Sequence, residues 1–253
     1  MGNIISVVNQ KGGVGKTTTV INLAAALAQK SKVLVVDMDP QGNLSTGVGV
    51  DIWKVSKTMY EVLIGEVAIT DAILEVEAEP FSILPSNMKL AGVEIECSTR
   101  TKKEYMLQTV LQQVEKDYDF ILIDCPPSVN LLNINALTAS NHILIPMQCE
   151  YYALAGLAQV LETLKLVQGK TNSKLDIIGI LFTMFDGRTK LANEVIDEVR
   201  RYFIQQVFET KINRSVRLSE APSHGLSCIK YAPNSKPTQQ YEEVAKELIE
   251  RVK

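Results

Sequence analysis

Three observations predict an α/β fold with a doubly wound, mostly parallel sheet and helices on both of its faces. Short apolar runs alternate with longer segments of helical periodicity along the 253 residues. Several of these runs, such as FILI at 120–123, are continuously apolar, which is typical of strands buried on both faces of a parallel sheet. Glycines or acids follow three runs, at the strand ends where such folds bind ligands. We therefore expect right-handed βαβ units.

The expected strands are short runs rich in aliphatic residues, and the expected helices are segments in which apolar residues recur at helical spacing. In chain order the strands are expected at 4–8, 32–36, 81–84, 120–123, 142–145 and 177–182, with a weaker one at 206–210. The helices are expected at 16–29, 59–64, 102–116, 131–139, 154–167, 191–202 and 239–252. No repeat, low-complexity tract or long linker divides them, so we expect a single domain spanning residues 1–253.

The composition excludes several classes of protein. A hydrophobic content of 46% and a charged content of 22% are typical of a soluble globular protein, and no apolar run is long enough to span a membrane. The four cysteines form no C-x-x-C pair, so neither a zinc site nor a disulfide framework is indicated. The net charge of −3 argues against a uniformly basic nucleic-acid binder, although residues 181–240 carry nine basic against six acidic side chains.

A phosphate-binding loop is predicted between the first strand and the first helix, where the sequence is KGGVGKTTT (11–19). Its glycines let the backbone approach a polyphosphate, whose charge the loop N–H groups and the helix N-terminus stabilise. Lys16 is expected at the β- and γ-phosphates and the Thr17 hydroxyl on Mg²⁺. The standard motif has glycine at position 10, where this chain has Gln10, followed by a second lysine. The expected nucleotide-binding residues are Lys11, Gly12, Gly13, Val14, Gly15, Lys16, Thr17 and Thr18.

Acidic residues follow two of the expected strands. Asp124 ends the apolar run YDFILID, the Walker B arrangement in which a carboxylate binds Mg²⁺ directly or through water. A capping or turn aspartate would also suit this position. Asp37 and Asp39 follow the second strand in VDMDPQGN. For Asp39 the residues alone leave two roles open, a base that orients water and a turn residue.

Together these motifs resemble the deviant Walker-A ATPases of the ParA/Soj type, which partition chromosomes and plasmids. KGGVGKT alone is similar to a wider group that includes MinD and the nitrogenase iron protein. DPQGN (39–43) together with RLSEAPSHG (217–225) narrows the resemblance to the Soj-like branch. The remaining matching segments are ILIDCPPS (121–128) and LFTMFDGRT (181–189), so the resemblance covers nearly the whole chain.

The resemblance implies a P-loop NTPase fold, an ATPase activity and a set of roles for the site. Lys11 resembles the signature lysine that crosses to the partner subunit's phosphates in an ATP-sandwich homodimer. Asp39 is similar to the acid that orients the attacking water, so the implied catalytic residues are Lys11, Lys16 and Asp39. Asp37 resembles a metal-side partner, which makes the implied Mg²⁺ residues Thr17, Asp37 and Asp124.

The same resemblance implies partners and a location. Arg188 and Arg217 resemble the family's contacts to non-specific double-stranded DNA, which need only phosphate-binding side chains. Ordinary surface charge is the alternative for them, and for the basic residues that would extend the surface, Lys190, Lys211, Arg214 and Lys230. A ParB/Spo0J-like centromere-binding protein would stimulate hydrolysis, and the protein would be cytoplasmic and nucleoid-associated. Because the first strand begins at Ile4, we expect no N-terminal DNA-binding domain of the kind that longer plasmid forms carry.

Two other functions on this fold stay open. A MinD-like membrane-associated ATPase would need a basic amphipathic C-terminal helix, whereas YEEVAKELIERVK sets four glutamates against Lys246, Arg251 and Lys253, so no stable membrane association is expected. A metabolic or redox ATPase with an iron–sulfur cluster would need cysteines placed to share the cluster, and none follows the Walker B segment closely.

Overall fold

The computed structural model describes residues 2–252, so Met1 and Lys253 lie outside the described residues. They form a seven-stranded sheet in the order β3-β4-β2-β5-β1-β6-β7, in which only β3 runs antiparallel to its neighbour. The predicted doubly wound α/β fold is therefore confirmed. The strands are β1 (Asn3–Val7), β2 (Val33–Asp37), β3 (Leu74–Glu75), β4 (Ser82–Leu84), β5 (Phe120–Asp124), β6 (His142–Gln148) and β7 (Asp176–Thr183).

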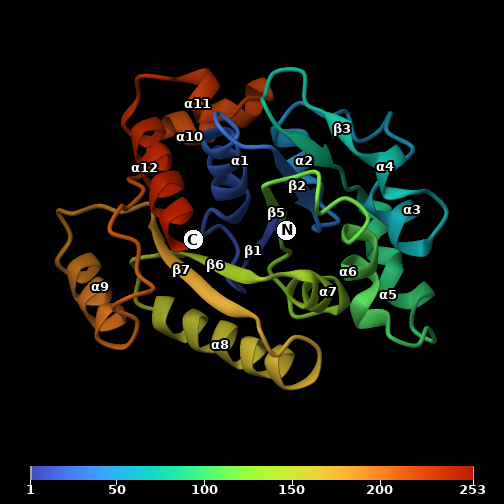
Figure 1. Cartoon of the computed structure of the whole chain (residues 1–253). Helices are drawn as coiled ribbons and strands as arrows, with labels where there is room; N and C mark the ends of the chain where they lie inside the picture. The colour runs from blue at the N-terminus through green and yellow to red at the C-terminus, as the bar shows by residue number, and fades with distance from the viewer. Residues whose placement is uncertain (1, 253) are drawn as a thin grey trace.

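Helices cover both faces of the sheet (Figure 1). The α-helices are α1 (Lys16–Leu27), α2 (Asn43–Gly47), α3 (Met59–Ile64), α4 (Ile69–Ala72), α5 (Val93–Glu96), α6 (Met106–Leu111), α7 (Leu131–Ala139), α8 (Ala153–Lys170), α9 (Lys190–Tyr202), α10 (Val216–Glu220), α11 (Cys228–Tyr231) and α12 (Lys236–Arg251). Short 3-10 helices span Met88–Gly92, Lys103–Tyr105 and Ala221–His224.

Successive side chains of each strand point to opposite faces of the sheet, which divides the core into two layers. In β5, Ile121 and Ile123 pack with the helices α3 to α9, whereas Phe120 and Leu122 pack with α1 and α12. Because both faces are covered, the strands are continuously apolar rather than alternating.

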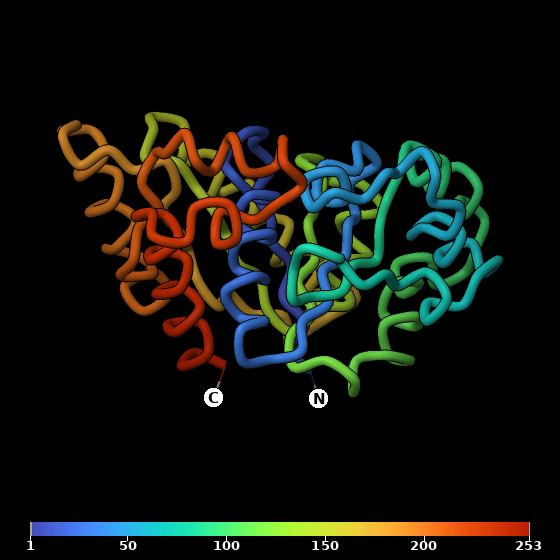
Figure 2. The backbone as a smooth tube through the Cα atoms, turned by 90° about the horizontal axis from the view of Figure 1, so that it is seen from above, coloured from blue at the N-terminus to red at the C-terminus, as the bar shows by residue number. Residues whose placement is uncertain are grey.

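Parallel pairing places the loops of the predicted site at one edge of the sheet. β1 lies between β5 and β6, and Val7 is in register with Asp124. Asp37 is likewise in register with Asp124 across β2 and β5. In Figure 2 the two termini lie at one edge of the molecule, and the loop between β1 and α1 lies at the opposite edge.

The weak strand expected at 206–210 is wrong. This segment makes only a single parallel bridge, between Val207 and Ile180. That bridge consists of two backbone hydrogen bonds with Ile180 of β7, which donates to the Gln206 carbonyl and accepts from the N–H of Phe208. Side chains of α12 hold the rest of the segment: Arg251 donates to the carbonyls of residues 206 and 207, and Glu247 accepts from the N–H groups of residues 209 and 210. Side-chain pairing of this kind leaves no pattern in the segment's own sequence.

The other differences concern short elements. The helix expected at 102–116 is confined to the 3-10 turn at 103–105 and α6, with turns after it. The hairpin strand β3 and the short helices α2, α4, α5, α10 and α11 were not predicted, because they contain too few residues to show periodicity.

The apolar stripe of α12 is part of the core. Tyr241, Val244 and Leu248 are buried in the layer that contains α1. The apolar side of this helix therefore packs against the protein's own core. Within residues 2–252, no helix is both long and apolar enough to cross a membrane.

Candidate nucleotide-binding site

The loop between β1 and α1 adopts a conformation that only glycine takes easily. Gly13 and Gly15 have φ angles of 74° and 88°, and Gly15 is the N-cap of α1 with no side-chain cap. Side chains from two neighbouring strands hold the loop by its carbonyls: Thr183 donates to Val14 (2.7 Å) and Gln148 to Gly13 (2.9 Å). The loop N–H groups and the first turn of α1 thus remain available to an anion.

A cleft of about 780 Å³ opens beside this loop. Its lining includes most of the predicted nucleotide residues and Asp39, together with the 126–128 segment after β5. Met88, Ala91 and Asn130, which belong to no motif, also line it, as does Met184 of the LFTMFDGRT segment. Two predicted residues do not line it: Val14 is buried beneath the loop, and Lys11 points elsewhere.

Lys16 is placed to face a polyphosphate. It begins α1, its residue is only 8% exposed, and its Nζ donates to the carbonyl of Lys11 at 3.3 Å. Burial lowers the pKa of the Lys16 ammonium, and the nearby Asp124 carboxylate opposes that shift. A buried cation with so weak an internal partner is suited to an anionic ligand.

Thr17 and Asp124 meet at the base of the cleft. The Thr17 hydroxyl donates to Asp124 Oδ2 at 2.6 Å, whereas the buried Asp124 Oδ1 has no hydrogen-bond partner among the described residues. Burial, and secondly the Asp37 carboxylate, raise the pKa of Asp124 to about 8. A hydroxyl beside an unpartnered carboxylate oxygen fits Mg²⁺, which typically takes one or two carboxylates and completes its shell with water and substrate phosphates.

Asp37 has a different environment from the one expected of a metal-side residue. Its Oδ2 accepts from the backbone N–H and the hydroxyl of Ser45 (2.9 and 2.7 Å), and its Oδ1 accepts from the N–H of Asp39 (3.1 Å). Burial raises the pKa of Asp37 to about 6. With both oxygens engaged, Asp37 anchors the loop 37–45, and it lies beside Asp124 in the sheet.

Asp39 lies on the wall of the cleft and is half-buried. Its Oδ1 accepts from the N–H of Gln41 at 3.0 Å, which is an Asx turn. The turn fixes the side chain while leaving the residue at the cleft surface, so the two roles that the sequence left open are compatible.

Lys11 is turned away from the cleft of its own subunit. Its Nζ lies 2.5 Å from Glu150 Oε2, on the segment between β6 and α8. The side chains of the pair are 37% and 57% exposed, so solvent screens the interaction.

A second cavity, of about 320 Å³, continues from the loop on the other side of Met184. Gly15 and Thr18 form its inner wall, and Met184, Asn213 and Leu218 contribute further walls. Met184 has a left-handed φ of 50°, which is uncommon for a residue with a side chain. No motif in the sequence predicted this cavity.

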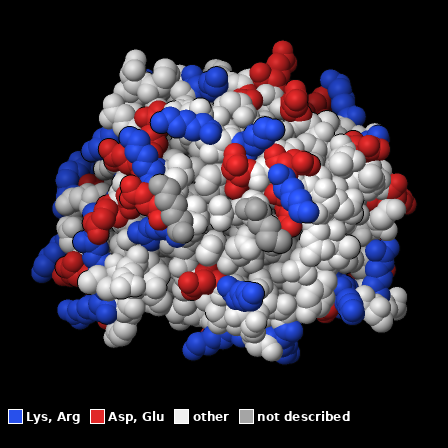
Figure 3. All heavy atoms as spheres, viewed as in Figure 1, with Lys and Arg blue, Asp and Glu red and all other residues white. Residues whose placement is uncertain are grey.

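The two arginines predicted to bind DNA are exposed, and each lies against an acid. Arg188 pairs with Asp186 (2.6 Å) and Arg217 with Glu220 (2.9 Å). Of the additional basic residues, Lys190 pairs with Glu194 and Lys211 lies over the ring of Phe185. On the face shown in Figure 3 acids and bases are interspersed, so one subunit presents no large patch of a single sign there.

Known proteins resemble this chain both in sequence and in fold. Residues 2–177 match the family model described as "AAA domain". The chain is 49% identical to the sporulation initiation inhibitor protein Soj of Bacillus subtilis, over 98% of both chains. It is 46% identical to the chromosome partitioning protein ParA of Myxococcus xanthus, over 99% of this chain and 89% of that protein. A solved structure titled cobyrinic acid a,c-diamide synthase from Mycobacterium smegmatis, with a bound ATP analogue and magnesium, is 36% identical, with a TM-score of 0.90 over 100% of this chain and 96% of the other.

Proposed function

The chain belongs to the ParA/Soj family of chromosome-partitioning ATPases, and from this premise we propose that ATP switches it between a monomer and a DNA-binding dimer. The observation that carries the proposal is the P-loop cleft, which Lys16 and Thr17 line and behind which the buried Asp124, with one unpartnered oxygen, accepts from the Thr17 hydroxyl. Because one sheet carries all the parts of the site, we treat residues 1–253 as a single P-loop ATPase domain.

ATP and Mg²⁺ are the ligands that suit the site. The triphosphate would lie along the loop N–H groups and Lys16, and the adenine base would enter the cavity beside Met184. Thr17 and Asp124 would hold Mg²⁺, with Asp37 acting through the loop that it anchors. The bound metal neutralises charge on the β- and γ-phosphates.

Hydrolysis would use residues from two subunits. Asp39, fixed by its turn at the cleft wall, would orient the attacking water. Lys16 would stabilise the phosphate charge within its own subunit. Lys11 would leave Glu150 and place a second cation on the neighbour's phosphates, as an arginine finger does. Because the Lys11–Glu150 pair is exposed, separating it would cost about 0–1 kcal/mol.

Exposed apolar side chains next to Lys11 support a dimer on this face. Tyr151 and Tyr152 are 76% and 71% exposed and follow Glu150 directly, and Val129, between two residues that line the cleft, is 50% exposed. Aromatic side chains of this kind are typical of interface cores. A two-fold through this face would bring two Lys11 residues toward two nucleotides.

Dimerisation would also create the DNA surface. Arg188 and Arg217 are each matched by an acid in one subunit, so a single copy offers little net attraction. Two copies on one face would double the phosphate contacts on one duplex. A ParB/Spo0J-like protein would then stimulate hydrolysis and release the DNA, and the protein would reside in the cytoplasm on the nucleoid.

The two alternatives have less support. For the MinD-like function, the apolar side of α12 is already buried against the core. For the metabolic function, the relative with a metabolic title is 36% identical, below the 49% and 46% of the partition proteins.

The test is duplex-DNA binding measured with ATP, with ADP and without nucleotide, across a salt series. We expect binding only with ATP, on unrelated sequences alike, and weakening steeply with salt. Binding that ignores the nucleotide, or that prefers one sequence, would contradict the proposal.

A further inference from the structure

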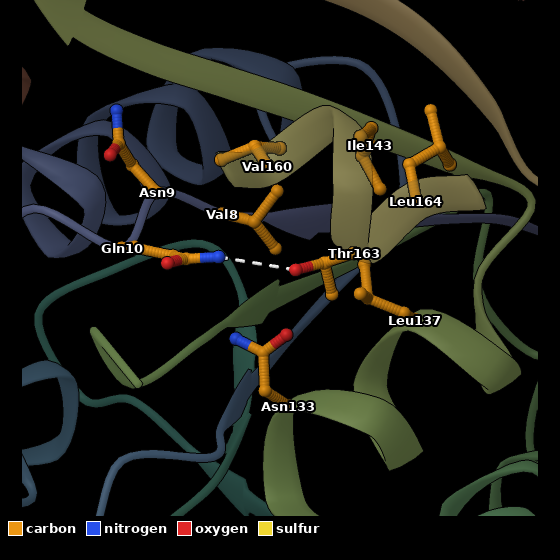
Figure 4. A pocket seen from close by; sticks show the side chains of 9 residues that line it. All are labelled: Val8, Asn9, Gln10, Asn133, Leu137, Ile143, Val160, Thr163 and Leu164. Carbon is orange, nitrogen blue, oxygen red and sulfur yellow. Dashed lines mark hydrogen bonds between the residues drawn. The ribbon is translucent and has the colours of Figure 1, made fainter. Parts of the chain in front are cut away.

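Gln10, which stands where the standard phosphate loop has glycine, ties the start of the loop to α8. Its Nε2 donates to the Gln159 carbonyl and to Thr163 Oγ1, both at 3.1 Å. Figure 4 shows Gln10 reaching Thr163 at the rim of a small, mainly apolar cavity. The cavity has a volume of about 10 Å³, room for no more than about one water, so the contact with α8 is direct.

The residues on either side of Gln10 are tied to the same part of the fold. Asn9 donates from Nδ2 to the Pro146 carbonyl of β6 (2.8 Å), and its Oδ1 accepts from the N–H of Lys11 (3.0 Å). The Lys11 side chain pairs with Glu150, between β6 and α8. The backbone and the side chain of Lys11 are therefore both positioned through the β6–α8 unit.

Beyond Lys11 the loop is held only by its carbonyls, which accept hydrogen bonds from Gln148 at Gly13 and from Thr183 at Val14. A Cβ added to Gly12 or Gly13 would meet no heavy atom within 4 Å, so these residues lie in open space. Lys16 belongs to α1, whose packing against the sheet fixes its backbone, and its Nζ contacts the Lys11 carbonyl only at 3.3 Å. A change at Gln10 would therefore displace Lys11 and cost Lys16 only this one long hydrogen bond.

We propose that Gln10 is a positioning residue for Lys11: by clamping the loop to α8, it aims Lys11 at the nucleotide of a second copy of the chain. This inference rests on the role proposed above for Lys11. The replacement of glycine at position 10 is thus part of the two-subunit mechanism, because a glycine there would remove the link to α8 and leave Lys11 held through Asn9 and Glu150 alone.

The experiment compares three variants of the full chain. Gln10→Gly restores the standard motif and removes the clamp, and Thr163→Val removes one of its two acceptors with little change in shape. Gln159→Ala is the matched control, because the clamp uses only its backbone carbonyl. The measurements are ADP affinity, ATP-dependent self-association by sedimentation, the kcat and KM of hydrolysis, and thermal unfolding.

For Gln10→Gly we expect ATP-dependent self-association to weaken at least about fivefold, the smallest change that the loss of two hydrogen bonds implies. ADP affinity should stay within about twofold of the parent, since Lys16 loses only one long hydrogen bond. Thr163→Val should show a smaller change in the same direction, kcat should fall more than KM changes, and Gln159→Ala should match the parent. Unchanged self-association and kcat in Gln10→Gly would overturn the inference, and so would an equal loss of ADP affinity.

Lys11→Ala separates this inference from the proposed function. If Lys11→Ala loses self-association but Gln10→Gly does not, only the role of Gln10 fails. If Lys11→Ala changes nothing, the two-subunit role of Lys11 fails and this inference fails with it. A double variant that is no worse in self-association than Lys11→Ala alone is the expected result, whereas an additional loss would indicate a merely structural role for Gln10.

Discussion

The ion pairs that hold Arg188 and Arg217 allow the DNA surface to be tested in both directions. Arg188 is 89% exposed, and its guanidinium donates from Nε and Nη2 to Asp186 at 2.9 and 2.6 Å. To bind a DNA phosphate, the guanidinium must release the Asp186 carboxylate. Arg188→Ala should therefore weaken binding, and Asp186→Asn should strengthen it, because the arginine would lose its internal competitor.

The magnitude follows from the number of phosphates neutralised. Each phosphate contact contributes about 0.9 to the slope of log K against log salt, so Arg188→Ala should lower the slope of a dimer by about 1.8. Between about 50 and 200 mM salt, that difference amounts to about a 12-fold change in the ratio of parent to variant affinity. Asp186→Asn keeps an acceptor for the N–H of Arg188, which now bonds Oδ1 at 3.1 Å, so the loop should be preserved.

Fluorescence anisotropy with a duplex and saturating ATP, repeated on two unrelated sequences, measures both slopes. ATP-dependent self-association of each variant should equal that of the parent, which serves as the control. The reasoning is refuted if Arg188→Ala leaves the slope unchanged, or if Asp186→Asn weakens binding on both sequences.

Four further predictions concern the nucleotide site and the fold. Lys16→Ala should abolish tight nucleotide binding, and retained ATP affinity by calorimetry would remove Lys16 from the phosphates. Asp39→Ala should keep ATP-dependent dimerisation but stop hydrolysis, and unchanged turnover would show that Asp39 acts only as a turn residue. Without Mg²⁺ and nucleotide, the free energy of unfolding in urea should fall as pH rises from about 5 to about 8. The reason is that Asp124, whose pKa is raised to about 8 in the folded state, keeps its proton there after the unfolded state has lost it. Asp124→Asn should flatten this pH dependence, and a slope that the variant leaves unchanged would contradict the prediction. Gly179→Ala should lower the free energy of unfolding by about 1–3 kcal/mol or more, since its Cβ would collide with the ring of Phe208, and an unchanged urea midpoint would show that the ring moves freely.

The parts of the site that the sequence predicts are those encoded by local order along the chain. The strand, glycine loop and helix that carry Lys16 are contiguous, and the Asp124 strand is a continuous apolar run, so each is recognisable alone. Their meeting follows from parallel pairing, which sets Asp124 beside Val7.

The parts that could not be predicted depend on contacts between distant residues. The pairing of Lys11 with Glu150 joins residues 139 positions apart, and the clamp from Gln10 to Thr163 joins residues 153 apart. The segment 206–210 has the composition of a strand, but its pairing with β7 stops after one bridge, and side chains of α12 bond the backbone on either side of it. The backbone of a segment with strand-like composition can thus be hydrogen-bonded either by a neighbouring strand or by side chains, and only its tertiary partners decide which.

One close contact joins the nucleotide side of the site to the arginine side. α2 follows directly after the Asp39 loop, and beyond it Gly49 lies against Gly225, at the end of the segment that carries Arg217. Both glycines have left-handed φ angles, and a Cβ on Gly225 would lie 2.8 Å from the Gly49 Cα, so the two backbones touch with no side chain between them. Because packed backbone cannot be compressed, a displacement of the Asp39 loop that reaches Gly49 must be matched at Gly225. The loop proposed to bind nucleotide and the segment proposed to bind DNA therefore meet at a backbone contact, which explains why two positions far apart in the sequence are both glycine.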